Sequence, residues 1–582
     1  MNGAPFKDRL PRWGNAWLLR PAERRPSPWF ADAAVGIGLF GIFYLIVTMA
    51  TSGSAHHIHP EISLSFGALP LYAAYSVARM LVAYVLSLSF TLVYGYVAAF
   101  NHRAERVLIP LLDILQSIPI LSFMPSVVLA ITALLPGSSL GVELASVVLV
   151  FTSQAWNMTF SFYNSLQTVP RELREVSRMY GLSWWQRFRQ LELPSAAVGL
   201  VWNSMMSWAG GWFFLMAAEM FTMGNRSYQV PGLGSYLQQA ATSGDVRAEL
   251  AGLLTLILVI VGLDQLIWRP LIAWADKFKI ELVANQSPPR SAVLILLRRS
   301  RLVDWATRRL FAPAIERIDQ ALSRQPAARP GGGSVSLGRR TLGWVAGLAV
   351  AVAAAYALWR GALLLVALPS RQAAEIPLDA LLSLLRVAAA LALGTLWTVP
   401  VGVFIGLNRA WANRLQPVVQ ILASFPATAL YPLIVISVGG LSWLSVLLML
   451  LGTQWYVLFN VIAGAMQIPQ DLQEASALFG LGRIQRWRTL ILPGIFPSLI
   501  TGLITASGGA WNAAIVTEYV QTGSRTISTP GLGSLIARAS GGGEYGLLLA
   551  STLTLSLIVV LVNRLFWRRL YRLAETRYTL LS

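Results

Sequence analysis

The sequence predicts an all-α polytopic membrane protein with about 12 transmembrane helices, arranged as two parallel six-helix repeats. Hydrophobic residues make up 55% of the 582 residues and charged residues only 12%. So few charges cannot solvate the surface of a soluble protein of this size. Apolar runs long enough to cross a bilayer, about 20 residues each, recur along the chain, and the second half repeats the pattern of the first.

The apolar runs divide the chain into predicted spans. In chain order they are 31–51, 71–100, 108–135, 141–165, 195–221, 248–269, 342–360, 378–407, 416–438, 441–465, 494–520 and 546–567. Several contain Pro or Gly, which helices in lipid tolerate when neighbours satisfy the freed backbone groups. The first run has the apolar character of a signal peptide, but a matching run opens the second half. We therefore interpret the first run as a retained helix.

Basic residues assign the connections to sides of the membrane. Arginine and lysine gather in residues 1–30, in 275–341 and in the C-terminal tail, whereas 52–70 and 136–140 contain none. The positive-inside rule therefore predicts that both termini and the central linker lie in the cytoplasm. The predicted units are an N-terminal segment 1–30, a first repeat 31–272 with its core at 70–270, a basic linker 273–341, a second repeat 342–570 with its core at 378–567, and a tail 571–582.

Composition also excludes several functions. The net charge of +19 comes from short basic connections, so we predict no binding of nucleic acid. Cysteine is absent, which excludes disulfides and thiolate metal sites. Of the three lysines, Lys7, Lys277 and Lys279, none follows a glycine-rich loop. The chain therefore does not hydrolyse ATP through a P-loop.

The internal repeat is visible as a gapless alignment. "PRELREVSRMYGLSWWQRFRQLELP" at 170–194 matches "PQDLQEASALFGLGRIQRWRTLILP" at 469–493, an offset of 299 residues. The same offset pairs other distinctive positions: Trp156 with Trp455, Trp212 with Trp511 and Glu219 with Glu518. Upstream the offset is 307, which pairs Arg79 with Arg386. An even number of spans per repeat gives both halves the same orientation, with a pseudo-two-fold axis along the membrane normal and a pathway between them.

Each half carries a polar stretch between two apolar runs, on the predicted cytoplasmic side. It opens on a proline suited to a first helical turn, has a glycine where a short helix would stop, and closes on a second proline at the return to the membrane. These positions are Pro170, Gly181 and Pro194 in the first half and Pro469, Gly480 and Pro493 in the second. Ser183 with Gln186 forms a capping box for a second helix. The pattern predicts a rigid helix–turn–helix projection.

These stretches carry the pattern E-A-A, three residues, G, nine residues, I-x-L-P, which is similar to that of inner-membrane permeases of ABC importers. The second copy reads Glu474-Ala475-Ser476, Gly480, Leu490-Ile491-Leu492-Pro493, and the first departs further with Glu175-Val176-Ser177, Gly181, Leu191-Glu192-Leu193-Pro194. The chain resembles two such permeases fused. It resembles their nitrate, sulfonate, taurine and bicarbonate branch, with an Arg early in a span ("SVARM", "SLLRV"), a Glu late in another ("AAEMF", "VTEYV") and a following "GLG".

This resemblance implies a type I ABC importer permease fold in a bacterial inner membrane, with no enzymatic activity and no bound cofactor in this chain. Two copies of a separate ABC ATPase subunit would hold ATP and Mg, and a periplasmic or lipid-anchored binding protein would deliver a small oxyanion. Coupling to the ATPase carries over onto Glu175, Gly181, Leu193, Pro194, Glu474, Ala475, Gly480, Leu492 and Pro493. The alternative is that each polar stretch is a solvated connector held by lipid headgroups.

Charges inside the predicted spans mark candidate pathway or gating residues. Arg79 and Arg386 lie at a depth similar to that of Glu219 and Glu518. Either each half contains a neutralising Arg–Glu ion pair, or the arginines attract an anionic solute while the glutamates serve structure or gating. Three further candidates follow glycine pairs that allow close helix approach, and they either pack or line the pathway: Trp212, Trp511 and Asn512.

Two remaining features have weaker functional meaning. His56, His57 and His59 form "HHIH" in an external loop with only Glu61 nearby in sequence, so an ordinary polar loop is favoured over a metal site. The linker contains the amphipathic stretch "SAVLILLRRSRLVDWATRRLFAPAIERI". We expect it to lie on the anionic inner leaflet.

A second class of transporter would also have two parallel six-helix repeats. A secondary active transporter with parallel six-helix repeats would use an ion gradient and need no ATPase partner. A neighbouring gene for a P-loop ATPase would discriminate against it. A membrane scaffold or enzyme is less well supported, because no nucleophile–base or metal constellation is present.

Overall fold

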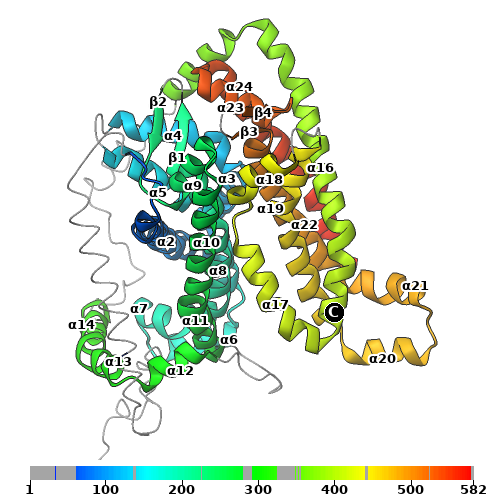
Figure 1. Cartoon of the computed structure of the whole chain (residues 1–582). Coiled ribbons are helices and arrows are strands. Elements are labelled where there is room, and N and C mark those ends of the chain that lie inside the picture. The colour runs from blue at the N-terminus through cyan, green and yellow to red at the C-terminus, as the bar shows by residue number, and fades with distance from the viewer. Residues whose placement is uncertain are drawn as a thin grey trace, which may run out of the picture.

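The computed structural model describes residues 61–134, 139–223, 226–278, 291–323, 355–438, 443–522 and 525–577, with the isolated positions 33, 348 and 352. The predicted span 31–51, most of 342–360 and the "HHIH" loop lie outside the described residues. The described part is almost entirely helical, with two short β-hairpins (Figure 1). The prediction of an all-helical polytopic membrane protein is confirmed.

The first half runs from helix α2 to helix α11. Its elements are η3 (Phe66–Ala68), α2 (Leu69–Phe100), α3 (His102–Ser117), α4 (Ile120–Leu134), α5 (Ser139–Gln167), α6 (Arg171–Met179), α7 (Trp184–Arg187), η4 (Phe188–Glu192), α8 (Leu193–Glu219), β1 (Met220–Met223), β2 (Arg226–Gln229), α9 (Leu233–Ser243), α10 (Val246–Leu263), η5 (Asp264–Trp268) and α11 (Arg269–Ala275). The linker follows with η6 (Asp276–Phe278), α12 (Ala292–Arg299), α13 (Arg301–Ala306), η7 (Thr307–Phe311) and α14 (Ala312–Ser323).

The second half repeats the order of the first. Its elements are α16 (Ser370–Leu407), α17 (Arg409–Ser424), η8 (Ala427–Leu430), α18 (Tyr431–Val438), α19 (Leu444–Met466), α20 (Gln470–Leu478), α21 (Arg483–Arg486), η9 (Trp487–Ile491), α22 (Leu492–Thr517), β3 (Tyr519–Thr522), β4 (Arg525–Ser528), α23 (Leu532–Gly542), α24 (Tyr545–Val562), η10 (Asn563–Trp567) and α25 (Arg568–Arg577). In both hairpins the strands are antiparallel, Met220 facing Gln229 in one and Tyr519 facing Ser528 in the other.

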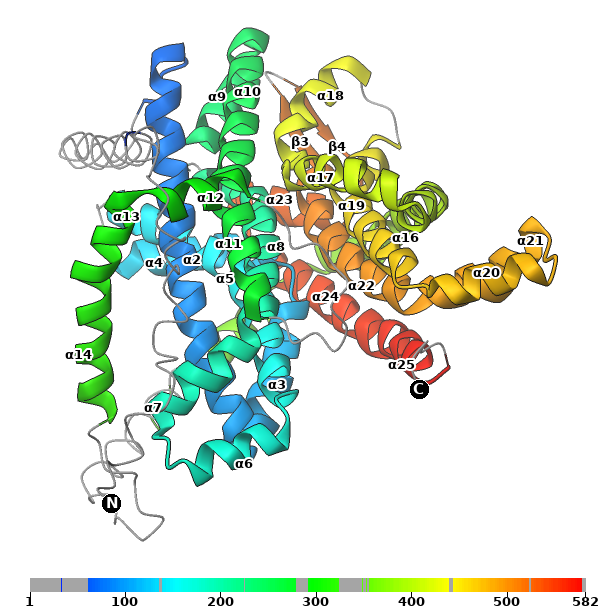
Figure 2. The same ribbon diagram turned by 90° about the horizontal axis from the view of Figure 1, so that it is seen from below.

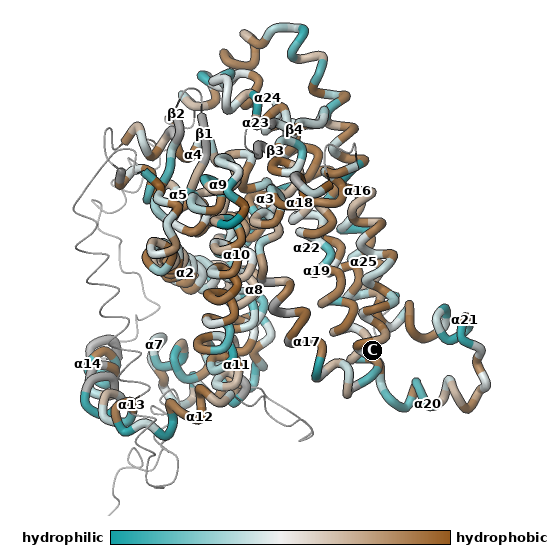
Figure 3. The backbone as a smooth tube through the Cα atoms, viewed as in Figure 1, coloured by the Kyte–Doolittle hydropathy of each residue, from teal (hydrophilic) through white to brown (hydrophobic). Residues whose placement is uncertain are grey.

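Six helices in the described residues are long and apolar enough to cross a membrane, or seven if the bent pair α3–α4 counts as one span. This is fewer than the twelve predicted. Two of the predicted spans fall largely outside the described residues. The helices α5 and α8 are also long enough to cross, with 29 and 27 residues, but they are not among these six. Figure 3 shows how apolar residues dominate most of the long helices.

Two runs that we predicted as continuous spans are broken. The run 108–135 divides into α3 and α4, which meet at 95°, and the run 416–438 divides into α17, η8 and α18. Each break falls where a proline follows an extended residue: Ile118 before Pro119 and Phe425 before Pro426. A proline disfavours helical backbone in the residue before it, which explains both breaks.

The broken helices carry each half into the other. Helix α4 contacts α22, α23 and α24 of the second half, while α17 and η8 contact α8 of the first half. Leu121 is accordingly buried in the hydrophobic core of the second half, and Ala429 in that of the first. The two halves are therefore interlocked around a shared axis.

Candidate functional site

Each polar stretch forms the helix–turn–helix that the sequence predicts. In the first arm (α6 and α7, residues 171–187), Gly181 has φ +64° and the Leu182 N–H donates to the Ser177 carbonyl at 3.1 Å. This left-handed residue and its backbone bond close the helix in the manner typical of glycine C-caps. Ser183 and Gln186 then form both hydrogen bonds of a capping box, at 3.3 and 2.9 Å.

The second arm (α20 and α21, residues 470–486) repeats this geometry. Gly480 has φ +63°, and the Leu481 N–H donates to the Ser476 carbonyl at 3.2 Å. Gly482 replaces the capping serine, so only the reverse bond remains, from its own N–H to Gln485 Oε1 at 3.1 Å. Any L-residue at Gly181 or Gly480 would be strained there.

Both arms present large apolar side chains to the surface at the turn. The exposed fractions are 86% for Met179, 64% for Tyr180, 88% for Leu478 and 81% for Phe479. These four residues, called the arm tips below, occupy the same two positions of each repeat. Large apolar side chains that lie together on a surface indicate an interaction site. Figure 2 shows the second arm extending away from the helical body.

The other predicted coupling residues lie on or at the base of these arms. Glu175 and Glu474 are exposed on their helices, and Glu474 accepts a hydrogen bond from Gln470 at 2.9 Å. Ala475 is half-buried. The pairs Leu193–Pro194 and Leu492–Pro493 occupy the first positions of α8 and α22. They join the arms to the long helices rather than taking part in the exposed tips.

The two arms differ in the contacts that they make with the linker between the halves. The linker helix α14 packs against α7 of the first arm (Figures 1 and 2). There Asp319 accepts a hydrogen bond from Trp185 Nε1 at 2.9 Å and forms an ion pair with Arg189. The repeat equivalent of Trp185 is Ile484, whose side chain is 71% exposed. Only the first arm therefore has this contact with the chain's own linker among the described residues.

A buried carboxylate network joins three elements of the first half. Glu219, fully buried at the end of α8, accepts hydrogen bonds from Ser76 at 2.6 Å and Arg79 at 2.5 Å on α2. Its other oxygen accepts from the Gly234 N–H on α9 at 2.6 Å. The second edge of the Arg79 guanidinium binds Glu143 at 2.5 and 2.8 Å. Both edges of the guanidinium are thus occupied by carboxylates.

The second half repeats this network with one member fewer. Glu518, also fully buried, accepts from Ser383 at 2.7 Å, from Arg386 at 3.0 Å and from the Gly533 N–H at 2.8 Å. Arg386 also donates to the Pro530 carbonyl at 2.6 Å. The repeat offset pairs Glu143 with Ser442, so the sequence offers no second carboxylate at that position.

The "GLG" that follows each hairpin belongs to these networks. A Cβ at Gly232 would lie 2.3 Å from the Glu219 carboxylate, and one at Gly531 would lie 2.3 Å from that of Glu518. A side chain at either position would displace the buried carboxylate. The glycines therefore permit the close approach of α9 and α23 to the buried carboxylates.

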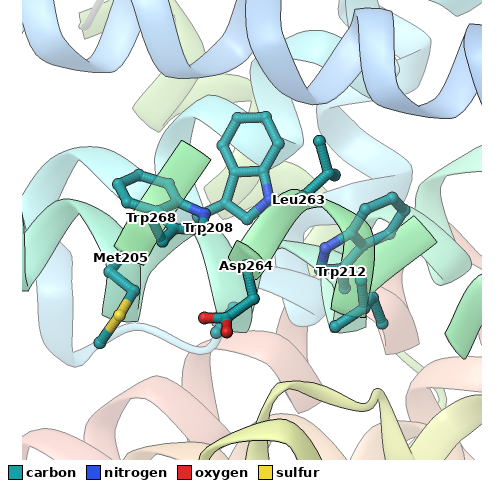
Figure 4. A pocket seen from close by; sticks show the side chains of 8 residues that line it. Met205, Trp208, Trp212, Leu263, Asp264 and Trp268 are labelled. Atoms are coloured by element: carbon teal, nitrogen blue, oxygen red, sulfur yellow. The ribbon is translucent and has the colours of Figure 1, made fainter. Parts of the chain in front are cut away.

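The structure places the predicted tryptophans in packed cores. Trp212 and Trp511 are each 1% exposed. Figure 4 shows Trp212 with Trp208, Trp268 and Asp264 around a cavity of about 10 Å³, which is room for one water molecule. Asn512 lies between the halves and accepts a hydrogen bond from the Leu121 N–H at 3.4 Å.

A second, larger cavity lies between the two halves, away from Trp212 and Trp511. A cavity of about 350 Å³ is lined from the first half by α4, α8, β1 and α9, and from the second by η8, α18, α22, β3 and α23. None of the seven predicted pathway residues lines it. Sequence reasoning missed its lining residues and also missed Ser76, Ser383 and Glu143. The two serines repeat at the offset of 307 residues, three positions before each arginine, and this signal could have found them.

No group of three or more His, Asp or Glu side chains suited to a metal ion occurs within the described residues. The prediction of an ordinary polar loop at "HHIH" is not tested, because His56, His57 and His59 lie outside the described residues.

These features define a class of protein: a duplicated polytopic membrane protein whose halves enclose a shared cavity and each carry one projecting arm. The family model for "Binding-protein-dependent transport system inner membrane component" matches the chain twice, over residues 91–267 and 398–578. Together the two matches cover more than half of the chain. The chain belongs to this family.

Individual relatives match shorter stretches. The chain is 28% identical over 141 residues to the bicarbonate transport system permease protein CmpB of Synechococcus elongatus, covering 24% of this chain and 51% of that protein. It is 30% identical over 179 residues to the taurine transport system permease protein TauC of Escherichia coli, covering 31% and 61%. For the nitrate import permease protein NrtB of Leptolyngbya laminosa the values are 25% over 183 residues, 31% and 63%. The chain thus spans about half to two-thirds of the length of these curated relatives.

The contact between α14 and the first arm can be tested by Asp319→Ala. The variant removes an ion pair and a hydrogen bond to a charged group, contacts of about 1.5–3 kcal/mol each. We expect amide hydrogen exchange in residues 184–189 to become about tenfold faster or more. Exchange in the equivalent residues 483–488 serves as the internal control and should not change. Equal exchange rates in wild type and variant at 184–189 would contradict this role.

The first carboxylate network can be tested by removing one or both partners of its buried pair. Arg79→Ala leaves Glu219 buried without its counter-charge, so we expect a loss of about 3–5 kcal/mol, measured as a lower thermal unfolding temperature in detergent. The double variant Arg79→Met with Glu219→Met should recover part of that loss, because neither charge remains buried. A double variant less stable than Arg79→Ala would argue against a mainly electrostatic role.

Proposed function

We propose that this protein is the transmembrane permease subunit of an ATP-driven ABC importer, with both halves of the solute pathway fused in one chain. The observation that carries the proposal is the pair of arms. Each ends in two exposed apolar side chains beside a glycine in the left-handed conformation, at the same repeat positions. This geometry suits insertion into an apolar groove of a partner protein.

Membership of this family supports an ATPase subunit as the partner that binds each arm. Members are inner membrane components of binding-protein-dependent transport systems, and the P-loop lysine needed to hydrolyse ATP is missing from this chain. We infer that two ATPase subunits, holding ATP and Mg, dock one on each arm. Because the arms continue through η4 and η9 into α8 and α22, a movement of an arm is transmitted to the helices that line the shared cavity.

The two ends of the molecule have different roles in this proposal. Both hairpins lie at the end opposite the arms (Figure 1). With the arms and both termini in the cytoplasm, the hairpin end faces outward, where a periplasmic or lipid-anchored binding protein would deliver the solute. ATP binding draws the arms together and opens the cavity outward, and hydrolysis resets it. The relatives named for nitrate, taurine and bicarbonate support a small oxyanion as solute.

The arm tips provide the test of this proposal. The protein is co-expressed with a candidate P-loop ATPase subunit from the same organism, and captured ATPase is counted after purification. Leu478→Glu with Phe479→Glu should reduce capture from two copies to one, because a charge in an apolar contact is costly. Met179→Glu with Tyr180→Glu should also leave one copy, and all four changes together should leave none.

Trp305→Glu is the matched control for the arm variants. Trp305 is a large apolar residue on α13 with 53% exposure, and its substitution should leave two captured copies. Full capture by the four-fold variant would overturn the proposal. Solute uptake that continues without any captured ATPase would favour the secondary active transporter instead.

A further inference from the structure

The linker between the two halves connects the end of the first half to the first arm. Helix α12 packs against α11, and α14 packs against α7, so the linker follows the outside of the first half from one contact to the other (Figure 2). The elements α13, η7 and α14 follow one another without a gap from Arg301 to Ser323. A position taken up by α13 is therefore transmitted directly to α14.

The helices α12 to α14 expose both apolar and basic side chains. The large apolar residues at their surface are Ile295, Leu302, Trp305 and Ile318. The exposed basic residues are Arg298, Arg299, Arg301, Arg308, Arg309 and Arg317. Only three acidic residues, Asp304, Glu316 and Asp319, lie in the same helices, and Asp304 is paired with Arg308 at 2.9 Å. We call the exposed apolar residues and arginines together the linker face, and its charge is strongly positive.

The linker begins at the depth of the membrane surface. The apolar span Val246–Ala275 ends on a small cluster in which Lys277 Nζ lies 4.6 Å from the ring centroid of Trp274 and 4.7 Å from that of Phe278. Tryptophan is enriched at the membrane–water interface, and a lysine near a helix end extends its ammonium group to the same level. Because α12 packs against α11, which contains Trp274, the linker face starts close to the lipid headgroups.

The other end of the linker acts on the joint of the first arm. Asp319 of α14 binds Trp185 and Arg189. The Trp185 ring stacks on Phe188 with the ring centroids 5.7 Å apart, and Phe188 meets Tyr96 of α2 edge-on at 5.6 Å. A movement of α14 therefore reaches the point where the arm joins the long helices.

The chemistry of the linker face suits an anionic lipid surface. A helix that carries arginines beside tryptophan, leucine and isoleucine binds in the plane of the interface, through its buried apolar area and its attraction to anionic lipids. Each arginine close to such a surface strengthens binding by about fivefold. The depth at which the linker begins favours the bilayer over a soluble acidic protein as the partner of this face.

We propose that the linker face binds the anionic lipid headgroups of the inner leaflet, and that this binding holds the first arm in position through Asp319. Lipid composition thereby regulates how firmly the first arm is joined to the helices of its half. This inference rests on the proposed function, because it treats the arm as the contact with an ATPase subunit.

This regulation applies to the first arm and not to the second. The second arm has Ile484 at the position of Trp185, and that side chain is exposed. The attraction between arginines and headgroups is screened by salt, with a screening length of about 8 Å at physiological ionic strength. We therefore expect the first arm to loosen when anionic lipid is scarce or the ionic strength is high, while the second arm stays unchanged.

The test measures amide hydrogen exchange of the full-length protein, without an ATPase, in nanodiscs of phosphatidylcholine alone or with phosphatidylglycerol. We expect phosphatidylglycerol to slow exchange by about fivefold or more in residues 301–306 and 184–189. The equivalent residues 483–488 of the second arm are the internal control and should not change. Asp319→Ala should keep the lipid effect at 301–306 and lose it at 184–189, because the connection to the arm is cut.

Variants of the linker face identify the lipid contact. The triple variant Arg298→Gln, Arg299→Gln and Arg309→Gln should remove the lipid effect at both segments, and so should Trp305→Glu. The matched control removes three exposed arginines from the end of the second half, in the triple variant Arg564→Gln, Arg569→Gln and Arg572→Gln. This control should retain the full lipid effect.

Three results would overturn the proposal: equal exchange of the wild type in both kinds of nanodisc, a lipid effect at 301–306 that does not extend to 184–189, or equal effects of the two triple variants. Loss of ATPase capture by Trp305→Glu would also overturn it, because the linker face would then bind the ATPase rather than lipid. Intact capture by the wild type without a lipid effect rejects lipid binding and keeps the importer. The expected lipid effect without captured ATPase rejects the importer and keeps lipid binding by the linker.

Discussion

The arrangement of each half depends on one fully buried carboxylate. Glu219 receives hydrogen bonds from α2 and from the first turn of α9, while it terminates α8 itself. Glu518 does the same for α16, α22 and α23. A carboxylate without partners would be very costly in this environment. Its partners therefore fix where α9 and α23 begin, and these helices carry side chains to the shared cavity.

This arrangement explains why the charges within the helical bodies lie away from the cavity. A buried ion pair gains little net stability, but the removal of one partner is strongly unfavourable. Arg79 is held on both edges by carboxylates and has no free edge for an anion. Each pair occupies the same position in its repeat and holds helices together there, while the lining of the shared cavity contains no charged side chain.

Much of the fold and of the arms could be predicted from the sequence, because these features depend on local signals. The gapless alignment of the polar stretches, the glycine at each turn and the capping box of Ser183 are all properties of short segments. The similar depth of Arg79 and Glu219 in their predicted spans was enough to suggest an ion pair between them. The breaks at Pro119 and Pro426 were missed, since proline is tolerated in many membrane helices. Glu143 was missed because a network member from a third helix leaves no periodic pattern. The cavity lining was missed because it depends on how the two halves interlock.

The fusion of both halves in one chain has a physical consequence for the site. In a symmetric dimer each substitution occurs on both sides of the axis, so a glutamine at the position of Gln238 would also stand at that of Ala537. Fused repeats escape this constraint, so Gln238 and Ala537 both line the shared cavity although only Gln238 is polar. The same reasoning applies to the arms. A fused chain has a single linker, so α14 can support only one arm, and the contact of Asp319 with Trp185 and Arg189 makes that arm the first. Asymmetry in the cavity and in the arms therefore has the same origin: the covalent connection that allows equivalent positions to differ.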